Sequence, residues 1–362
     1  MTDESTPMIP TLTAVLQQAV ARPDADPELT ARIAAVTDYL SAASDESSAP
    51  FLSVIVRTQG LRIEPFKDVL LCLQAQSTSD FEVIVVVHNA DPEHASLVRE
   101  AVSAFPASFR ERVRVIDVEG GSRSRPLNVG LEHANGRYLS FYDDDDIVFA
   151  HWVESFVTGA KQSPGVLLRA VVANQPVEPE VWARGVSGLR SAAWPRPEWD
   201  DSFDLVGHLV VNKSPFMSWA FPRTLFSTLG VRFDEELVAA EDWDVILQGA
   251  LMLGVADVPE LTSIYRRWTN AESSYTAHSG DDWRQSEQRV IDRINAMVLT
   301  LPPGNSVPLR QQVLFAEALH HYRFLFKGHQ LRQPLLGAWK AAAPGMRLAV
   351  RVRDKVRRMR SR

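Results

Sequence analysis

The chain has 362 residues, which is long enough for one large α/β domain or for two smaller domains. Of these residues 45% are hydrophobic and 23% are charged, which is ordinary for a soluble globular protein. Its one cysteine, Cys72, excludes an internal disulfide, so a reducing cytosol is the expected compartment. There is no signal-peptide pattern at the start and no apolar run near the ~20 residues of a membrane span, so we expect a chain that does not cross a bilayer.

Charge is distributed unevenly along the chain. Residues 347–362 hold eight Lys or Arg against one acid, Asp354, which gives this segment a charge of +7. The whole chain carries −7, so the preceding 346 residues carry −14 (−7 minus +7). The acidic body argues against nucleic acid as a partner, and the basic end suggests contact with something anionic.

The first fifty residues predict a helical extension followed by a linker. Asp26-Pro27-Glu28 is typical of a helix start, because Asp caps, Pro fits the first helical position and Glu favours the first turn. We expect a helix over about 27–42, and the composition of SAASDESSAP (41–50) predicts a linker.

From Phe51 onward, strands and helices alternate. The expected strands are 51–58, 81–89, 113–118 and 137–142, and the expected helices are 64–76, 91–105 and 125–136. Continuous Val/Ile runs separated by amphipathic helices indicate an α/β fold with a mostly parallel sheet covered on both faces. Ligands of such sheets bind at the carboxyl ends of the strands. The Thr58-Gln59-Gly60 turn and the run Asp143–Asp146 should therefore open onto the same crevice.

The pattern is less regular in the second half. Residues 174–203, rich in proline and tryptophan, predict a long loop or lid. A helix with three acids near its start, Glu241, Asp242 and Asp244, is expected next. VPELTSIYRRW (258–268) predicts a last strand that ends in a basic, aromatic turn. A helical region is expected over about 282–332.

The four consecutive aspartates repel one another unless water or a cation relieves the repulsion. One interpretation is a solvated turn in which one Asp caps the next helix. An EF-hand calcium loop is excluded, because its alternating oxygen ligands, central Gly and final Glu are absent. The remaining interpretation is Mg²⁺ or Mn²⁺ held by one or two carboxylates and completed by the phosphates of a ligand.

Several segments, in this order, resemble the family 2 glycosyltransferases of the GT-A fold. They are SVIVRTQG, FKDVLLCLQAQSTSDFEVIVV, SRSRPLNVGLEHANGRYLSFYDDDD and FDEELVAAEDWDVILQGA. The resemblance covers about residues 52–268 and implies a Rossmann-like, mostly parallel mixed sheet flanked by helices, with helical extensions at both ends. The implied divisions are an extension (1–50), a nucleotide-sugar-binding half (51–150), an acceptor-binding half (151–270), a helical region (271–346) and a basic tail (347–362).

The resemblance also implies a donor site at the aspartates. Asp143 and Asp145 stand at the two ends of its Asp-x-Asp signature, so Asp145 is the expected main ligand of Mn²⁺ or Mg²⁺, and Asp143 or Asp144 is expected to face the ribose or the metal. A UDP-sugar is the favoured donor. The other residues expected to bind the nucleotide sugar are Thr58, His88, Asn89, Arg125 and Asn128. Arg123 and Arg125 could assist the phosphates or be ordinary surface arginines.

Asp242 is the candidate general base. An inverting transfer needs a carboxylate to take the proton of the acceptor hydroxyl, and the neighbouring acid Glu241 would raise the pKa of Asp242. Glu241 and Trp243 are expected to bind or orient the acceptor. The alternative is that the acids of this helix only complement the helix dipole.

Two positions depart from the family pattern. Val87-His88-Asn89 stands where the family often has paired aspartates, which makes uridine less secure. Trp268 stands where many members have a His after Tyr-Arg, which leaves a third protein ligand of the metal in doubt. The Gln-x-x-Arg-Trp signature of processive members is absent, since position 264 is Ile.

The C-terminal tail places Leu348, Val352, Val356 and Met359 on one helical stripe among arginines. This pattern is typical of an interfacial helix on anionic lipid, although a solvated end has similar composition. The sequence therefore predicts a metal-dependent, inverting, non-processive glycosyltransferase of cell-surface polysaccharide assembly, cytoplasmic or peripheral on the inner face of the membrane, with a glycan or lipid-linked acceptor. A catalytically silent scaffold of the same fold and a nucleotidyltransferase remain alternatives.

Overall fold

The structure is a computed structural model that describes residues 21, 26–42, 49–181, 187–269, 279–297, 299, 309–311, 313 and 314. The chain divides into two compact units, Met1–Asn305 and Ser306–Arg362. The elements named below belong to the first unit. The predicted tail (347–362) and most of the predicted helical region (271–346) lie outside the described residues.

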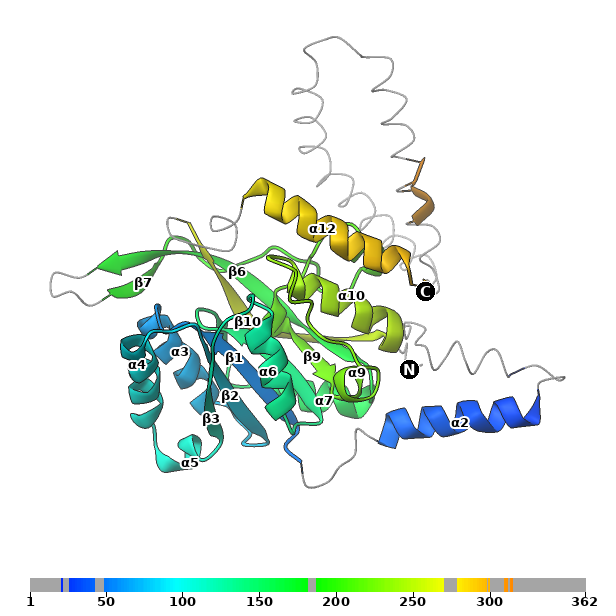
Figure 1. Cartoon of the computed structure of the whole chain (residues 1–362), viewed down its shortest axis with the longest axis horizontal. Helices are drawn as coiled ribbons and strands as arrows, with labels where there is room; N and C mark the ends of the chain where they lie inside the picture. Colours follow the sequence, from blue (N-terminus) through cyan, green and yellow to red (C-terminus); the bar gives the residue numbers. More distant parts are fainter. Residues whose placement is uncertain are drawn as a thin grey trace, which may run out of the picture. The chain divides into compact units, whose positions relative to one another are not determined.

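The secondary structure follows the predicted alternation through the first half of the main domain (Figure 1). The strands are β1 (Leu52–Thr58), β2 (Phe81–His88), β3 (Val113–Val118), β4 (Tyr138–Asp143), β5 (Ile147–Val148), β6 (Leu167–Val181), β7 (Ser187–Ser191), β8 (Arg196–Pro197), β9 (Trp219–Pro222) and β10 (Val255–Trp268). The helices are α2 (Pro27–Ala42), α3 (Ile63–Gln74), α4 (Pro92–Ser103), α5 (Ala107–Arg110), α6 (Arg125–His133), α7 (Trp152–Gln162), α8 (Leu205–His208), the 3-10 helix η1 (Phe216–Ser218), α9 (Thr224–Ser227), α10 (Glu241–Leu253) and α12 (Gly280–Asn295). The helix predicted for 27–42 is confirmed as α2.

The strands form one mixed sheet in the order β3-β2-β1-β4-β9-β6-β10-β5, with β7 and β8 paired to β6. The first four are parallel to one another, and β9 is antiparallel to both β4 and β6. The carboxyl ends of β1, β2, β3 and β4 therefore lie along one edge, as the sequence predicts.

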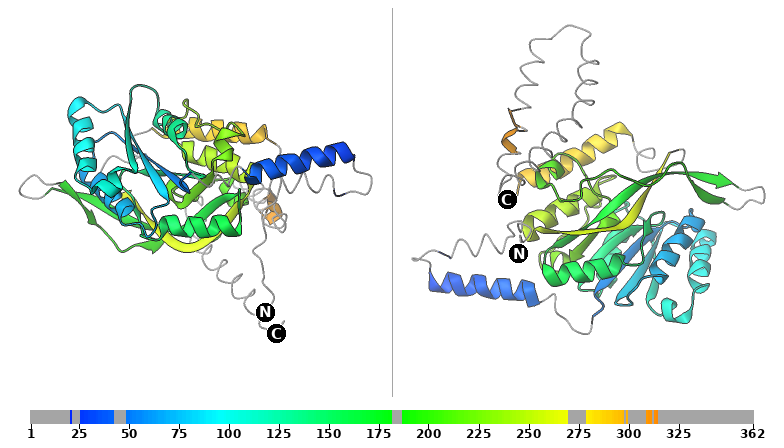
Figure 2. Two further views of the ribbon diagram at one scale, coloured as in Figure 1. Left: turned by 90° about the horizontal axis from the view of Figure 1, so that it is seen from below. Right: turned by 180° about the vertical axis from the view of Figure 1, so that it is seen from behind.

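Helices cover both faces of the sheet (Figure 2). Val54 and Val56 of β1 pack in a cluster with α3, α4 and α7, whereas Ile55 packs in a second cluster with α6 and α10. Successive side chains of a strand point to opposite faces, so the continuous apolar run fills both layers. Burying each such side chain stabilises the fold by about 1.5–3 kcal/mol. Gly130 of α6 permits close approach, since a Cβ there would lie 2.5 Å from Ile55 Cγ2.

The loop or lid predicted for 174–203 is wrong. Among its described residues, 174–181, 187–191 and 196–197 are strand: β6 runs to Val181, and β7 and β8 pair with it antiparallel. The prolines of this segment suggested a loop. The pairing of β6 with β10 ends at Val177, however, and Pro179 follows that residue in the part of β6 that pairs only with β7. There β6 is an outer strand of a two-stranded ribbon, where proline is tolerated. Figures 1 and 2 show this β6–β7 ribbon projecting beyond the rest of the sheet.

The turn predicted at YRRW (265–268) is also wrong. Tyr265 to Trp268 continue β10 and pair with β6, with Trp268 opposite Val177. A basic, aromatic sequence suggested an exposed turn, but pairing along β6 keeps these residues extended. This extension carries Trp268 to the functional site described below.

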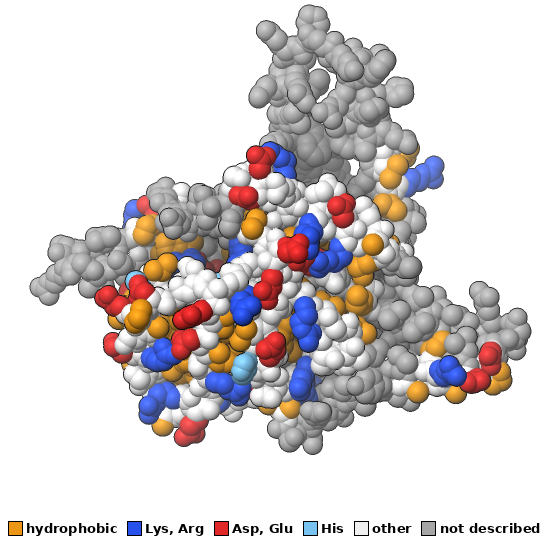
Figure 3. Space-filling view, in the orientation of Figure 1, with side chains coloured by type: hydrophobic (Ala, Val, Ile, Leu, Met, Phe, Trp, Pro, Cys, Tyr) orange, Lys and Arg blue, Asp and Glu red, His pale blue; other side chains and the backbone are white. Residues whose placement is uncertain are grey.

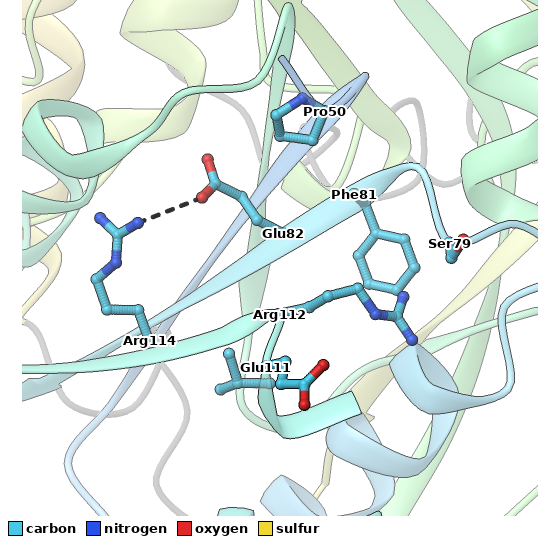
Figure 4. Close-up of a pocket in the computed structure, with 8 residues that line it drawn as sticks. Pro50, Ser79, Phe81, Glu82, Glu111, Arg112 and Arg114 are labelled. Atoms are coloured by element: carbon cyan, nitrogen blue, oxygen red, sulfur yellow. Dashed lines mark ion pairs between the residues drawn. The ribbon is translucent and has the colours of Figure 1, made fainter. Parts of the chain in front are cut away.

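The outer surface of the first unit carries no dominant charge on the face drawn in Figure 3, where acidic and basic side chains alternate. A pocket of about 360 Å³ lies at the amino ends of β2 and β3, between Phe81, Glu82, Arg112 and Arg114 (Figure 4). It is at the opposite edge of the sheet from the aspartates. Among the described residues, no helix has the length and apolar character that a membrane span requires.

Candidate functional site

The candidate site lies where β1 and β4 end side by side. The two strands are parallel neighbours, and Arg57 of β1 stands opposite Asp143 of β4. Thr58 Oγ1 donates a hydrogen bond to Asp144 Oδ2 at 2.6 Å. The turn after β1 and the aspartate run after β4 are therefore in direct contact, which confirms that they share one site.

Asp143 is held by a buried arginine. Arg57 Nε donates to Asp143 Oδ1 at 2.7 Å, and the Arg57 side chain is only 13% exposed. Burial alone would raise the pKa of Asp143, but the charge and hydrogen bond of Arg57 hold it below its ordinary value. Asp143 is therefore a stable carboxylate at neutral pH.

A second arginine, Arg62, spans the next two aspartates. Its guanidinium pairs with Asp144 at 3.2 Å and forms a closer ion pair with Asp145. Trp268 Nε1 also donates to Asp145, at 2.6 Å. Burial and the neighbouring carboxylates nevertheless raise the pKa of Asp145 to about 7. Arginines and an indole are thus the groups that offset the repulsion among these carboxylates.

Asp146 is turned toward the sheet rather than toward the other aspartates. Its Oδ1 accepts the backbone N–H of Arg266 in β10 at 2.8 Å, and its carbonyl accepts Tyr142 Oη at 3.0 Å. The side chain is 3% exposed, and burial with the Asp145 charge raises its pKa well above the ordinary value. These contacts of Asp146 stabilise the turn in which Asp143, Asp144 and Asp145 lie.

The carboxylates can be tested for their fit to a divalent cation. Among the described residues, no three His, Cys, Asp or Glu side chains are grouped as a complete metal site. Asp143 and Asp145 offer carboxylate oxygens, which suit Mg²⁺ or Mn²⁺ when one or two of them are completed by phosphate oxygens. The set therefore fits a cation shared with a ligand.

Glu241, the first residue of α10, is tied to the aspartate run through arginines. Its Oε1 accepts from Arg57 Nη1 at 2.7 Å and pairs with Arg123 Nε at 2.9 Å. Glu241 is 2% exposed; burial acts to raise its pKa, but the two arginines hold the pKa below its ordinary value. Arg57 thus links Glu241 to Asp143.

Asp242 is oriented by two hydrogen bonds. Its Oδ2 accepts Asn212 Nδ2 at 2.8 Å, and its Oδ1 accepts the backbone N–H of Trp243 at 2.8 Å. Burial, together with the charge of Glu241, raises the pKa of Asp242 to about 6. A carboxylate with this pKa is largely ionised at neutral pH and more basic than an ordinary aspartate, as proton abstraction requires.

Trp243, expected to help with the acceptor, is an internal residue. Its side chain is 3% exposed, and its indole N–H donates to the carbonyl of His208 at 2.7 Å. This contact anchors the segment that carries Asn212. The backbone N–H of Trp243 therefore helps to orient Asp242, and its buried side chain is not available to contact an acceptor.

His88 and Asn89 both contact the backbone of Gly120. His88 Nε2 lies 2.9 Å from Gly120 O, and Asn89 Oδ1 accepts from Gly120 N at 2.6 Å. Asn89 has a φ of 52°, in the left-handed region that asparagine tolerates. These bonds tie the end of β2 to the turn after β3, at the same edge as the aspartates.

Arg125 and Asn128 lie against another loop. The amide of Asn128 donates to Phe233 O and accepts from Phe233 N, each at 2.9 Å, and Arg125 pairs with Glu235 at 3.7 Å. Arg123, which precedes α6, pairs with Glu241, whereas Arg125, the first residue of α6, does not reach that carboxylate. Asn128 thus holds the segment that leads to α10.

Arg57, Arg62 and Asn212 belong to the site but were not predicted from the sequence. Arg57 had a recognisable signal, because an arginine inside a buried apolar strand needs a carboxylate partner. Arg62 and Asn212 stand in connecting segments with no such pattern. Their partners lie 83 and 30 positions away in the chain.

Comparisons with known proteins bear on the family and on the fold. Residues 54–222 match the sequence model of glycosyl transferase family 2. The uncharacterized glycosyltransferase EpsJ of Bacillus subtilis (strain 168) is 26% identical over 202 residues, which cover 53% of this chain and 54% of EpsJ. This chain therefore spans about half the length of that relative. The crystal structure of S. aureus TarS 1-349 in complex with UDP-GlcNAc aligns with a TM-score of 0.53 and 17% identity, over 69% of this chain and 68% of the other. That likeness concerns the fold.

Proposed function

Because residues 54–222 form a domain of glycosyl transferase family 2, we propose that the protein moves a sugar from a nucleotide-sugar donor to an acceptor hydroxyl with inversion at the anomeric carbon. The predicted family resemblance and the predicted GT-A fold are confirmed by the family match and the TarS alignment. The residues that carry the reaction are assigned below from their contacts.

The donor is proposed to bind at the carboxyl ends of β1, β2 and β4. Asp143 and Asp144 would hold the ribose and the diphosphate side of the donor, with Thr58 fixing Asp144. His88, the last residue of β2, and Asn89, which follows it, are proposed to contact the nucleobase. A UDP-sugar is the first candidate, supported by the UDP-GlcNAc held by TarS.

A divalent cation, Mn²⁺ or Mg²⁺, is proposed to be held by Asp145 and Asp143 together with the donor diphosphate. Such a cation stabilises the charge that develops on the leaving diphosphate. The support from this chain is chemical: the available ligands are carboxylates, which these hard cations prefer.

Asp242 is proposed as the general base. Its carboxylate would accept the proton of the acceptor hydroxyl while that oxygen bonds to the anomeric carbon and the diphosphate leaves. Asn212 and the Trp243 backbone hold the carboxylate in place. Burial, together with the charge of Glu241, keeps the pKa of Asp242 above that of an ordinary aspartate. A positioned base of this kind contributes about 10²–10⁴-fold to the rate.

One observation carries the proposal: Arg57 pairs with both Asp143 and Glu241, each at 2.7 Å. The proposed donor aspartates and the helix that bears the proposed base therefore belong to one connected site. Two independent acidic turns would not need a shared, buried guanidinium.

The acceptor is proposed to be a glycan or a lipid-linked glycan in cell-surface polysaccharide assembly, modified without processive elongation. Position 264 is Ile where the Gln-x-x-Arg-Trp signature of processive members would have Gln, which supports transfer without processive elongation. Membrane contact through residues 347–362 stays a prediction, because these residues lie outside the described part of the chain.

The test is a thermal-shift panel of nucleotide sugars with and without Mn²⁺, on wild type and Asp145→Ala. Ligands that bind the native state raise the melting temperature by mass action. The proposal expects one donor to stabilise wild type only with Mn²⁺, and the shift to vanish in Asp145→Ala. If no nucleotide or nucleotide sugar shifts wild type with any metal, a silent scaffold becomes the better account of this domain.

A further inference from the structure

Arg62 occupies the part of the site where the cation is proposed. It is the residue that precedes α3, in the turn after β1, and its side chain makes no cap hydrogen bond to that helix. Instead its guanidinium pairs with Asp144 and Asp145 and lies 5.5 Å from the centre of the Trp268 ring. Arg62 therefore supplies positive charge to these two carboxylates.

The contact with Asp145 involves the oxygen that a cation would need. Asp145 Oδ2 accepts from both Arg62 Nη1 and Trp268 Nε1. A cation on this oxygen would meet the guanidinium at bonding distance, and two positive charges that close repel each other. Metal binding and the Arg62 contact therefore exclude each other at Asp145 Oδ2.

Arg62 can leave its partners at lower cost than Arg57 can. The Arg62 side chain is 39% exposed, whereas that of Arg57 is 13% exposed and bridges carboxylates from two elements. Water can therefore solvate a displaced Arg62 guanidinium. Of the two arginines, Arg62 is therefore the one that a cation can displace more easily.

We propose that Arg62 is a second donor-binding residue that exchanges partners. In the absence of donor it holds Asp144 and Asp145; the divalent cation displaces it, and its guanidinium then binds the donor diphosphate. The planar fork of a guanidinium binds phosphate oxygens in pairs, and Arg62 stands at the carboxyl ends of parallel strands, where such phosphates bind. This inference rests on the proposed function.

The test measures binding of Mn²⁺ and of UDP to the full chain by titration calorimetry, without acceptor or turnover. Arg62→Gln should bind Mn²⁺ alone at least about tenfold more tightly than wild type, because the competing charge is gone. At saturating Mn²⁺ it should bind UDP at least about tenfold more weakly, because a charge-assisted bond is lost. Arg62→Lys keeps the charge and should bind Mn²⁺ as wild type does. Arg99→Gln, which removes an exposed arginine paired with Asp117 on the outer surface, should change neither affinity.

The outcomes separate this inference from the metal site itself. If Asp145→Asn loses Mn²⁺ but Arg62→Gln binds it no more tightly than wild type, the metal site stands and Arg62 does not compete for it. Unchanged UDP affinity in Arg62→Gln would overturn the exchange to the diphosphate. If wild type, Arg62→Gln and Asp145→Asn all bind Mn²⁺ alike, the proposed metal site is wrong and the exchange with it. Melting curves without ligand check that each variant is folded.

Discussion

Arg57 Nη1 lies 2.7 Å from Glu241 Oε1, and this ion pair joins the first strand of the sheet to helix α10 across 184 positions of the chain. The same guanidinium binds Asp143 through Nε. Glu241 is buried and the Asp143 side chain is 34% exposed, so Arg57 compensates both charges, with Arg123 as a second partner of Glu241.

Replacing Arg57 by Leu should therefore cost stability as well as activity. Removing one partner of a buried ion pair leaves the other charge uncompensated and costs about 3–5 kcal/mol. We expect Arg57→Leu to lower the free energy of unfolding by about 3 kcal/mol in urea denaturation. The control is Arg190→Leu, which breaks the exposed pair with Glu178 on the β6–β7 ribbon and should cost about 0.5 kcal/mol or less. Equal losses in the two variants would show that the Arg57 bridge adds nothing.

The pH dependence of turnover should reflect Asp242. Its pKa is about 6, raised by burial and by the charge of Glu241, and the base must be unprotonated, so kcat/KM should fall as the pH drops through about 6. Glu241→Gln removes a charge that raises this pKa, so the acidic limb should move to lower pH. Glu260→Gln, at an exposed position of β10, should leave the limb where it is. A limb that moves upward in Glu241→Gln would contradict the assignment of Asp242 as the base.

Asp242→Asn should separate catalysis from donor binding. The amide keeps the shape of the side chain but cannot accept the proton, so kcat should fall about 10²–10⁴-fold. The affinity for UDP in the presence of Mn²⁺, measured by calorimetry, should stay within about twofold of wild type, because Asp242 is held by Asn212 rather than by Asp143, Asp144 or Asp145. Asp281→Asn, an exposed acid of α12, is the control. Full turnover in Asp242→Asn would require a different base.

Much of the fold could be predicted because its signals are local. Continuous Val/Ile runs mark β1 and β2 as buried on both faces, and parallel topology then brings the ends of β1 and β4 together. The prediction was wrong at β6, because the prolines of this segment are typical of a loop. Only the pairing of β6 with β10 and β7 shows that a strand tolerates these prolines here.

The aspartates of the site could be predicted, but the groups that neutralise them could not. Arg57 and Arg62 meet their carboxylates across 86 and 83 positions, and nothing in the intervening sequence fixes that pairing. The position of Trp268 depended on β10 continuing as a strand where its composition suggested a turn. Such ion pairs depend on which distant segments the fold brings together, and local sequence patterns do not contain this information.

The residue at position 268 should influence the affinity for Mn²⁺, because it determines whether the protein offers a further metal ligand beside Asp145. Its indole N–H is 2.6 Å from Asp145 Oδ2, so a histidine in its place would put a ring nitrogen, a metal ligand, near that carboxylate. We expect Trp268→His to bind Mn²⁺ about tenfold more tightly than wild type in calorimetry at pH 7.5. Trp268→Phe, which removes the N–H and adds no ligand, is the matched control and should show no such gain. Similar affinities in the two variants would place the metal away from Trp268.

Helix α12 lies outside the residues matched by the family model, yet its Arg293 pairs with Asp244 in the helix of the proposed base. Arg293 forms close ion pairs with Asp244 and Asp234, and the Asp244 side chain is only 1% exposed. Arg293 itself is 30% exposed, so Arg293→Ala should lower the free energy of unfolding by about 2 kcal/mol, less than for a fully buried pair. Arg284→Ala, which breaks an exposed pair with Asp281 in the same helix, should cost about 0.5 kcal/mol or less. Both are measured by urea denaturation. If Arg293→Ala costs no more than Arg284→Ala, α12 does not stabilise α10, and a chain that ends before α12 should keep its donor-binding affinity.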